Sequence, residues 1–367
     1  MGRGCALEIL VSGALPDERF WRGRRVFLTG HTGFKGGWLT LWLKSLGAEV
    51  CGYSLAPSTD PNLFETARLG EACRSILGDI RDMAALEQAF RDFQPDIVLH
   101  LAAQPLVRRS YQDPLETWST NVMGTAHVLD LVRRTPEVRA ALIVTTDKCY
   151  ENLEQITPYR ETDRLGGRDP YSSSKAGAEL ATRSWWWSYF STSGAPAVAS
   201  ARAGNVVGGG DWSADRLVPD LMQAFAQGRP AILRNPEAVR PWQHVLEPCC
   251  GYLLAVEHIC RTEATSPPAW NFGPDAEGNV AVGEIAAGLA SAWGEGACFE
   301  VHRDPGAVHE ATLLTLDHTK ARTDLDWRPR WPLATTLAKT ADWYRAHDAG
   351  RDMRAVSEQQ LSDYFSA

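Results

Sequence analysis

The chain has 367 residues, of which 44% are hydrophobic and 22% charged, and its net charge is 37 − 45 = −8. This length suffices for a large core and favours two substructures. The acidic balance argues against a general nucleic-acid binder and against adhesion to anionic membranes, and no apolar run reaches the roughly 18 residues of a membrane span.

The cysteines and the N-terminal segment bear on where the protein works. Eight cysteines are spread along the chain without a Cys-x-x-Cys pair, several of them inside apolar runs such as the one around Cys51. Reduced, buried thiols explain this better than disulfides, and the clustered spacings of a zinc site are missing, so no metal is expected. The run at 5–11 carries a carboxylate and makes a poor signal peptide. A cytoplasmic location is expected.

Strands and helices are predicted to alternate along the first 205 residues. Residues 1–22 read as an extension ahead of the fold. Strands are predicted at 25–29, 49–53, 74–77, 97–101, 140–145 and 197–203, and helices at 38–46, 83–93, 117–133 and 171–190. This alternation predicts an α/β fold with a doubly wound parallel sheet of the Rossmann type.

The composition changes after Asn205, where short elements rich in proline and arginine follow a run of glycines. We therefore expect residues 23–205 to form a dinucleotide-binding domain to which 239–274 return. Residues 206–238 and 275–367 are expected to form a smaller, mixed, substrate-binding lobe.

A glycine-rich turn follows the first predicted strand and contains Gly30, Gly33 and Gly36. Glycines placed there let the backbone approach a pyrophosphate at a helix N-terminus. A tight strand–helix turn without a ligand is the alternative reading. The second strand ends at Ser54 without the usual acidic residue, and no Arg or Lys nearby would hold a 2′-phosphate. NAD is favoured over NADP.

A second group of polar residues predicts the chemistry. Thr146, Asp147 and Lys148 follow a predicted strand, and Tyr171 and Lys175 lie four residues apart on one face of a predicted helix. The Lys175 ammonium is expected to lower the tyrosine pKa and so produce a base suited to alcohol oxidation. Asp147 and Lys148 exceed what that reaction needs, which indicates an elimination. A surface ion pair is the alternative for Asp147 and Lys148, and an ordinary exposed helix pair is the alternative for Tyr171 and Lys175.

These motifs carry a family resemblance over roughly residues 20–345. The matching segments are Thr29–Gly36, Gly78-Asp79, His100–Ala103, Asn121, Thr146-Asp147 and Tyr171–Lys175. They resemble the extended short-chain dehydrogenase/reductase family, and within it the nucleotide-sugar 4,6-dehydratases. The stretches 30–36, 104–111, 146–152, 201–212 and 239–248 are most similar to CDP-glucose 4,6-dehydratases. Lys148 departs from the Glu that is usual among dehydratases, which puts the usual base assignment in doubt.

The resemblance implies a set of NAD contacts and a reaction. The cofactor residues would be Gly30, Thr32, Gly33, Phe34, Gly36, Ser54, Asp79, Ile80, Leu101, Ala102 and Ala103, with Tyr171 and Lys175. Asp79 has a turn aspartate as its alternative reading. CDP-glucose would be oxidised at C4, lose water across C5 and C6, and receive the hydride back at C6, giving CDP-4-dehydro-6-deoxyglucose. Such products supply deoxy sugars for surface polysaccharide such as lipopolysaccharide O-antigen.

The resemblance also assigns roles to the catalytic residues. Tyr171 would take the proton of the sugar 4-hydroxyl, Thr146 would hydrogen-bond the 4-oxygen, and Asp147 would protonate the leaving hydroxyl. Two roles for Lys148 remain open. If the Lys148 amine is neutral, it would be the C5 base, and its pKa would have to be lowered by about three units from roughly 10.4. If the Lys148 amine is charged, it would stabilise the C5 enolate.

Cations are expected around the substrate diphosphate, since guanidinium groups bind phosphates in a forked geometry. Arg216, Arg234 and Arg240 are the candidates, and the family position favours Arg240 with Asn205 beside it. Gln104 and Arg109 follow the fourth strand and are further substrate-binding candidates, with Arg109 expected to face the sugar. A solvated surface charge is the alternative for each arginine.

Oligomeric state and competing functions complete the predictions. Three consecutive tryptophans at 185–187 cannot all face one core. With the resemblance, they indicate a homodimer formed through the helices at 117–133 and 171–190. The competing functions are a nucleotide-sugar epimerase or reductase, in which Asp147 would have no use, and a nucleotide-sugar-binding protein without catalysis, which an intact Thr146, Tyr171 and Lys175 argue against.

Overall fold

The computed structural model describes residues 13–302 and 313–367. The first part of the predicted extension, 1–12, and residues 303–312 of the predicted lobe lie outside this description. Within the described residues, no helix combines the length and apolarity needed to cross a bilayer.

The main sheet confirms the predicted fold class. Seven strands, all parallel, lie in the order β10-β6-β5-β4-β1-β2-β3. They are β1 (Arg25–Thr29), β2 (Glu49–Ser54), β3 (Arg74–Leu77), β4 (Ile97–His100), β5 (Ala140–Val144), β6 (Ala197–Ala203) and β10 (Ala269–Phe272). The strand order reverses at β1, whose neighbours are β2 and β4, so a crevice opens beyond the carboxyl ends of β1 and β4.

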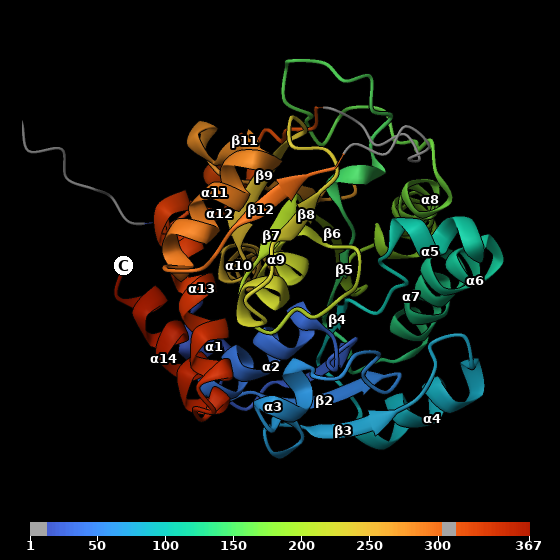
Figure 1. Cartoon of the computed structure of the whole chain (residues 1–367). Coiled ribbons are helices and arrows are strands. Elements are labelled where there is room, and N and C mark those ends of the chain that lie inside the picture. Colours follow the sequence, from blue (N-terminus) through green and yellow to red (C-terminus); the bar gives the residue numbers. More distant parts are fainter. Residues whose placement is uncertain (1–12, 303–312) are drawn as a thin grey trace, which may run out of the picture.

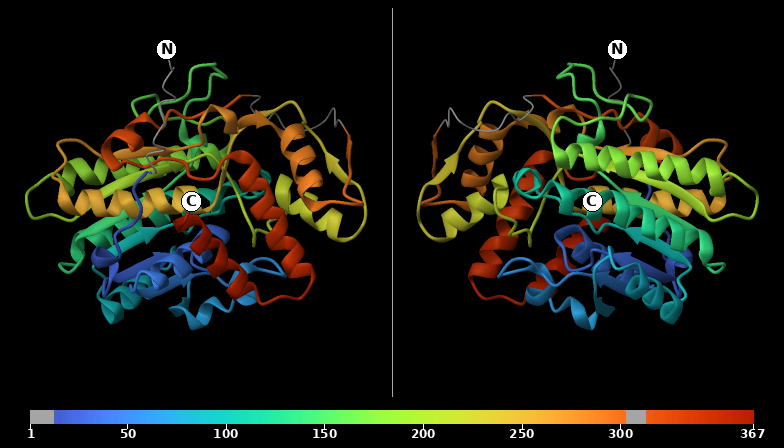
Figure 2. Two further views of the ribbon diagram at one scale, coloured as in Figure 1. Left: turned by 90° about the vertical axis from the view of Figure 1, so that its left-hand side faces the viewer. Right: turned by 90° about the vertical axis from the view of Figure 1, so that its right-hand side faces the viewer.

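Helices cover both faces of this sheet, as its apolar strands require (Figure 1). Val26 and Leu28 of β1 join one core, with α2 (Phe34–Ser45) and α10 (Leu246–Arg261), whereas Phe27 faces the opposite core. That second core lies under α4 (Met83–Phe93), α7 (Gly124–Arg134) and α8 (Pro170–Trp185). Figure 2 shows the helices as layers on either side of the sheet.

Two of the predicted helices are interrupted by π-helical turns. The helix predicted at 117–133 is α6 (Pro114–Trp118), the π turn η2 (Ser119–Met123) and α7, and the one predicted at 171–190 is α8 and the π turn η4 (Trp186–Phe190). The three tryptophans do diverge as expected: Trp186 is buried, whereas the Trp187 side chain is 57% exposed.

Shorter elements build the smaller part of the molecule. One sheet joins β7 (Asn205–Val207), β9 (Val239–His244) and β11 (Asn279–Ala281), and another joins β8 (Ala231–Leu233) to β12 (Phe299–Val301). The helices here are α9 (Leu217–Ala226), α11 (Val282–Trp293), α12 (Thr319–Leu325), α13 (Leu333–Asp348) and α14 (Met353–Phe365). Residues 239–274 were expected to return to the main sheet: β10 pairs with β6 and α10 packs on β5 and β6, whereas β9 pairs with β7 and β11 instead.

The two ends of the described chain pack on the main core. The fold was expected to begin after residue 22, yet α1 (Glu18–Trp21) precedes β1 and the Trp21 indole is fully buried, where it donates to Glu257. At the other end, Tyr364 of α14 contacts the Trp42 ring of α2 edge to face. The Arg330 guanidinium donates to the carbonyl oxygens of Gly13, Tyr364 and Ala367 and so ties both ends together.

Candidate active site

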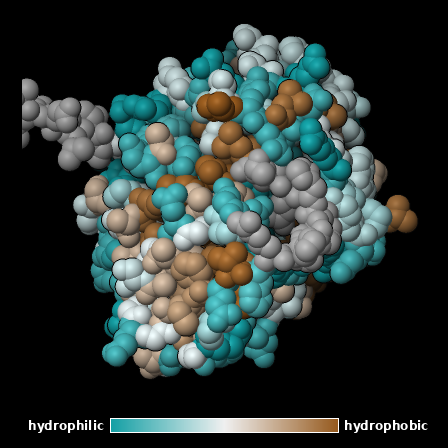
Figure 3. Space-filling model, turned by 45° about the horizontal axis from the view of Figure 1, so that its top comes forward, coloured by the Kyte–Doolittle hydropathy of each residue, from teal (hydrophilic) through white to brown (hydrophobic). Residues whose placement is uncertain are grey.

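A cleft of about 1160 Å³ opens at the carboxyl ends of the main strands and continues between them and the smaller sheets. Every residue that the sequence assigned to cofactor, substrate or catalysis lines this cleft. Figure 3 shows the upper face of the molecule, on which hydrophobic residues gather near the middle and hydrophilic ones surround them.

The glycine turn at one end of the cleft is shaped for a pyrophosphate. Gly30 has a φ of +81°, and a Cβ on Gly36 would lie 2.1 Å from the Gly30 carbonyl oxygen, so side chains are excluded here. Gly33 caps α2 without any side-chain hydrogen bond to the first-turn amides. Those amides and the positive end of the helix dipole suit a diphosphate.

The end of β2 closes this part of the cleft. The Ser54 and Thr32 hydroxyls lie 2.8 Å apart, and Thr32 also donates to the Leu55 carbonyl oxygen. Asp79, expected beside the adenine, forms an ion pair with Arg81 at 2.5 Å. That ion pair lowers the pKa of Asp79.

The catalytic cluster begins where β5 ends. Thr146 donates to Asp147 Oδ1 at 2.9 Å, while the buried Oδ2 has no hydrogen-bond partner among the described residues. Burial raises the pKa of Asp147, although Lys148 and the Thr146 hydrogen bond oppose this. A carboxyl group that retains its proton to higher pH is suited to act as a general acid.

Tyr171 and Lys175 project from α8 into the same space. Lys175 Nζ lies 3.5 Å from the Val144 carbonyl oxygen, and burial lowers the Lys175 pKa to about 8. The expected lowering of the Tyr171 pKa is not found: burial raises it to about 12, and the Thr146 hydrogen bond only partly offsets this. Desolvation of a phenolate outweighs the neighbouring donors here.

A buried polar network behind the cluster was not predicted. Glu179 of α8 accepts hydrogen bonds from Thr145 at 2.5 Å and Ser200 at 2.8 Å, and it forms an ion pair with Arg202 of β6 at 2.7 Å. Arg202 also donates to the Tyr150 hydroxyl. The network holds the end of β5, from which Thr146 projects. Its only signal in the sequence is charge inside two apolar elements.

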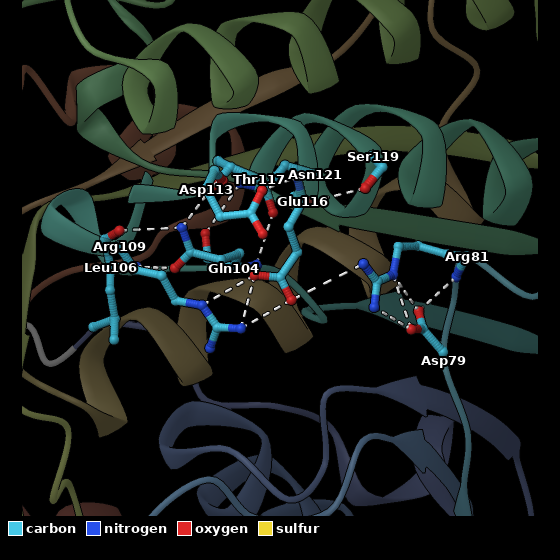
Figure 4. A network of polar contacts seen from close by, with 10 residues as sticks. All are labelled: Asp79, Arg81, Gln104, Leu106, Arg109, Asp113, Glu116, Thr117, Ser119 and Asn121. Carbon is cyan, nitrogen blue, oxygen red and sulfur yellow. Dashed lines mark hydrogen bonds and ion pairs between the residues drawn. The ribbon is translucent and has the colours of Figure 1, made fainter. Parts of the chain in front are cut away.

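Gln104 was predicted to bind substrate, but its amide is bonded within the protein (Figure 4). Nε2 donates to the Thr117 hydroxyl and the Leu106 carbonyl oxygen, and Oε1 accepts from the Leu106 amide. Asn121, in the π turn, bonds to the Gln104 backbone and donates to Ser174 of α8. Gln104 therefore braces the loop after β4 because all of its polar atoms are engaged.

Arg109 lies at the cleft rim in α5 (Val107–Gln112) and is half exposed. Its guanidinium forms a forked pair with Glu116, at 2.9 and 3.0 Å (Figure 4). Glu116 also faces Arg81 across 4.0 Å. The arginine expected at the sugar is thus held by a carboxylate of the neighbouring helix.

The predicted diphosphate arginines gather on the other side of the cleft. Arg216 pairs with Asp211 at 2.9 Å, and Arg234 pairs with Asp215 at 3.0 Å. Arg240 of β9 is buried, and its charge acts on Asp147.

Lys35, in the first turn of α2, is a further cleft residue that the sequence reasoning did not assign. Burial lowers its pKa to about 8, and its charge acts on both Asp147 and Lys175. The signal was a basic residue in a helix start, 34–38, that is otherwise apolar or glycine.

Comparison with known proteins agrees with this geometry. A family model described as GDP-mannose 4,6 dehydratase matches residues 27–340. A CDP-glucose 4,6-dehydratase of Salmonella typhimurium is 46% identical over 96% of this chain and 99% of the relative. A probable dTDP-glucose 4,6-dehydratase of Sinorhizobium fredii is 29% identical over 87% of this chain and 92% of the relative.

Solved structures share the fold. UDP-glucose 4-epimerase of Thermotoga maritima, determined with UDP-glucose, has a TM-score of 0.76 at 23% identity and covers 88% of this chain and 99% of its own. dTDP-glucose 4,6-dehydratase of Bacillus anthracis, determined with NAD, has a TM-score of 0.74 at 20% identity and covers 89% and 98%. The family match and the sequence relatives confirm the predicted resemblance, and the chain belongs to the nucleotide-sugar dehydratase family that the GDP-mannose 4,6 dehydratase model describes.

Proposed function

We propose that the protein is an NAD-dependent hydro-lyase that converts CDP-glucose to CDP-4-dehydro-6-deoxyglucose and water. The observation that carries the proposal is the buried Asp147 carboxyl, which shares the cleft with Tyr171 and Lys175 and has one oxygen without a hydrogen-bond partner in the part of the chain that the structure describes. An epimerase or reductase has no use for an acid at this position. The cytidine nucleotide follows from the 46% identical Salmonella relative.

The glycine turn fits the dinucleotide. Gly30 and Gly36 keep the approach to the α2 amides open, which supports binding of a pyrophosphate there. When bound, NAD supplies an acceptor for the C4 hydride and returns the hydride at C6. We assign to the Lys175 ammonium the role of holding the nicotinamide-side ribose, since it lines the cleft beside Tyr171.

The protons are handled by residues of the chain. Tyr171 Oη receives the proton of the sugar 4-hydroxyl, and Thr146 Oγ1 hydrogen-bonds the same oxygen. Asp147 delivers its proton to the departing C6 hydroxyl, a role that its raised pKa supports. Lys148, at the cleft surface of the same turn, acts on the C5 hydrogen as base or as a cation beside the enolate.

The smaller lobe contributes the cations of the substrate site. Arg240 and Arg216 lie nearest the catalytic cluster, since the charge of Arg240 acts on Asp147 and that of Arg216 acts on Tyr171. We assign both to the diphosphate, with Asn205 beside them, and Arg234 to the outer part of the cleft. Diphosphate binding there would exchange the Arg216–Asp211 pair for a forked contact to phosphate.

A nucleotide-sugar panel tests this function. Purified protein is incubated with CDP-, dTDP-, GDP- and UDP-glucose, and keto-sugar formation is followed together with NADH absorbance. Keto-sugar from CDP-glucose without net NADH is expected, and Asp147→Asn should reduce the rate at least 100-fold. Net NADH formation would indicate a simple dehydrogenase, and no product from any of the four would refute catalysis of this class.

We infer further that the protein forms a homodimer through the segments 117–133 and 171–190, which comprise parts of α6, α7 and α8 and the two π turns. Leu180 on α8 is 55% exposed, and Leu115 and Trp118 on α6 are 81% and 43% exposed. Large apolar side chains on neighbouring helices make a patch suited to a partner surface. Leu180→Glu should shift sedimentation from dimer to monomer, whereas Ile156→Glu, on a loop where the side chain is 89% exposed, should not. A Leu180→Glu dimer would refute this interface.

A further inference from the structure

Lys35 brings a positive charge into the catalytic part of the cleft from the glycine-turn helix. Its side chain lines the cleft, and no hydrogen bond or ion pair holds it among residues 13–302 and 313–367. The groups whose charges act on it are Cys249 of α10, Asp211 and Arg216 of the loop after β7, and Asp147 after β5; Lys175 of α8 is in turn affected by Lys35.

These neighbours place the Lys35 ammonium between the dinucleotide turn and the reacting groups. Helix α2 begins at the glycine turn that is assigned to the pyrophosphate. The charge of Lys35 acts on Asp147 and Lys175 in the catalytic part of the cleft. Lys35 lines the same cleft as Tyr171 and Lys175, the two residues assigned to the nicotinamide half of the cofactor.

We propose that Lys35 is a further functional residue, whose ammonium favours the reduced, uncharged nicotinamide over the oxidised, cationic one. The proposal rests on NAD as the cofactor of the proposed function and deepens it. Hydride transfer from the sugar C4 removes the positive charge of the ring, while the hydroxyl proton goes to Tyr171. A nearby fixed cation makes that charge loss favourable, because like charges repel more strongly in a partly buried site than in water.

The charge of Lys35 depends on pH. Burial lowers its pKa to about 8, so the ammonium is present at pH 7 and lost as the pH rises above 8. Asp147 and Asp211 oppose this lowering, and Arg216 adds to it. The preference for the reduced cofactor should therefore be strong at pH 7 and weak at pH 9.5, within the range where Lys175 also titrates.

Nucleotide binding in the absence of any sugar tests the proposal. The dissociation constants of NAD+ and NADH are measured for the full chain, freed of bound nucleotide, at pH 7 and 9.5. Lys35→Met should lower the preference for NADH at pH 7 by about tenfold, which corresponds to about 30 mV in the potential of the bound couple. Lys44→Met, in the exposed last turn of the same helix, should leave the preference unchanged.

The outcomes separate this inference from the proposed function. A NADH preference in Lys35→Met equal to that of the wild type would overturn the inference, even if the wild type makes keto-sugar. If Lys35→Met does not fold, Lys35→Arg provides the test, because its guanidinium stays charged at pH 9.5. A preference in Lys35→Arg that no longer weakens with pH supports the role of Lys35, and one that weakens as in the wild type overturns it. Failure of the sugar panel alone would refute the proposed catalysis and leave the inference about nucleotide binding by Lys35 standing.

Discussion

The buried pair of Arg202 and Glu179 should be the most costly single ion pair to break in the described structure. The side chains are 2% and 1% exposed and lie 2.7 Å apart. Removing one partner of a buried pair typically costs about 3–5 kcal/mol, because the other charge is left without compensation. Arg202→Met should reduce the free energy of unfolding by this amount, with Thr145 and Ser200 still bonded to the remaining carboxylate.

The pH dependence of the free energy of unfolding shows whether the uncompensated Glu179 charge causes the loss of stability. In the wild type, Arg202 lowers the Glu179 pKa, so the pair's contribution is present above the unfolded pKa and is lost as the pH falls. Without Arg202, burial should outweigh the hydrogen bonds from Thr145 and Ser200 and raise the Glu179 pKa, so the variant's stability should fall as the pH rises from 5 to 8. Arg202→Met combined with Glu179→Gln should recover most of the loss at pH 8.

Urea unfolding at pH 5 and pH 8 measures all of these changes. Arg160→Met is the matched control, since Arg160 pairs with Asp317 at 2.8 Å but is 66% exposed; its loss should stay below about 1 kcal/mol. The reasoning is refuted if Arg202→Met costs no more than this control, or if adding Glu179→Gln makes the protein less stable still. The rate of keto-sugar formation should fall as well, because Thr145 directly precedes Thr146.

Three further predictions concern the cleft and its support. Lys148→Met should slow solvent deuterium incorporation at C5 by about 100-fold, and unchanged incorporation would exclude Lys148 from that step. Gly36→Ala places a Cβ 2.1 Å from the Gly30 carbonyl oxygen and should weaken NAD binding in calorimetry, unlike Gly70→Ala, whose nearest contact is at 3.6 Å. Burial raises the Glu247 pKa from 4.5 to about 7. The free energy of unfolding should therefore fall by about 3 kcal/mol as the pH rises from 4.5 to 7. Glu247→Gln should flatten this pH dependence when it is measured by urea unfolding.

Local sequence patterns predicted the main sheet well. β1, β3, β6 and α4 have the predicted bounds, because each is a short apolar or amphipathic run between clear turn signals. The π turn Ser119–Met123 was missed because a single inserted residue leaves the hydrophobic pattern of the helix almost unchanged. The pairing of β8 with β12 joins strands of only three residues from distant parts of the chain, which no local pattern reports.

The site was predictable where one motif carries it and unpredictable where partners come from elsewhere. The glycine turn and the Thr146–Lys148 turn each lie within a few residues, and the sheet topology brings them into one cleft. The bonding of Gln104 to Thr117 and of Arg109 to Glu116 depends on how α5 packs on α6, which spacing does not report. The raised Tyr171 pKa likewise reflects depth of burial, a property of the whole fold.

The Arg330 guanidinium donates hydrogen bonds to the carbonyl oxygens of both Gly13 and Ala367, so the two ends of the described chain are neighbours in space. A few added residues would suffice to join residue 13 to residue 367, and the circle could be reopened at Gly194, a surface turn where an added Cβ would meet nothing within 4 Å. Such a circular permutant should keep the cleft intact, while a bulky tag fused directly after Ala367 would compete with the Arg330 contacts.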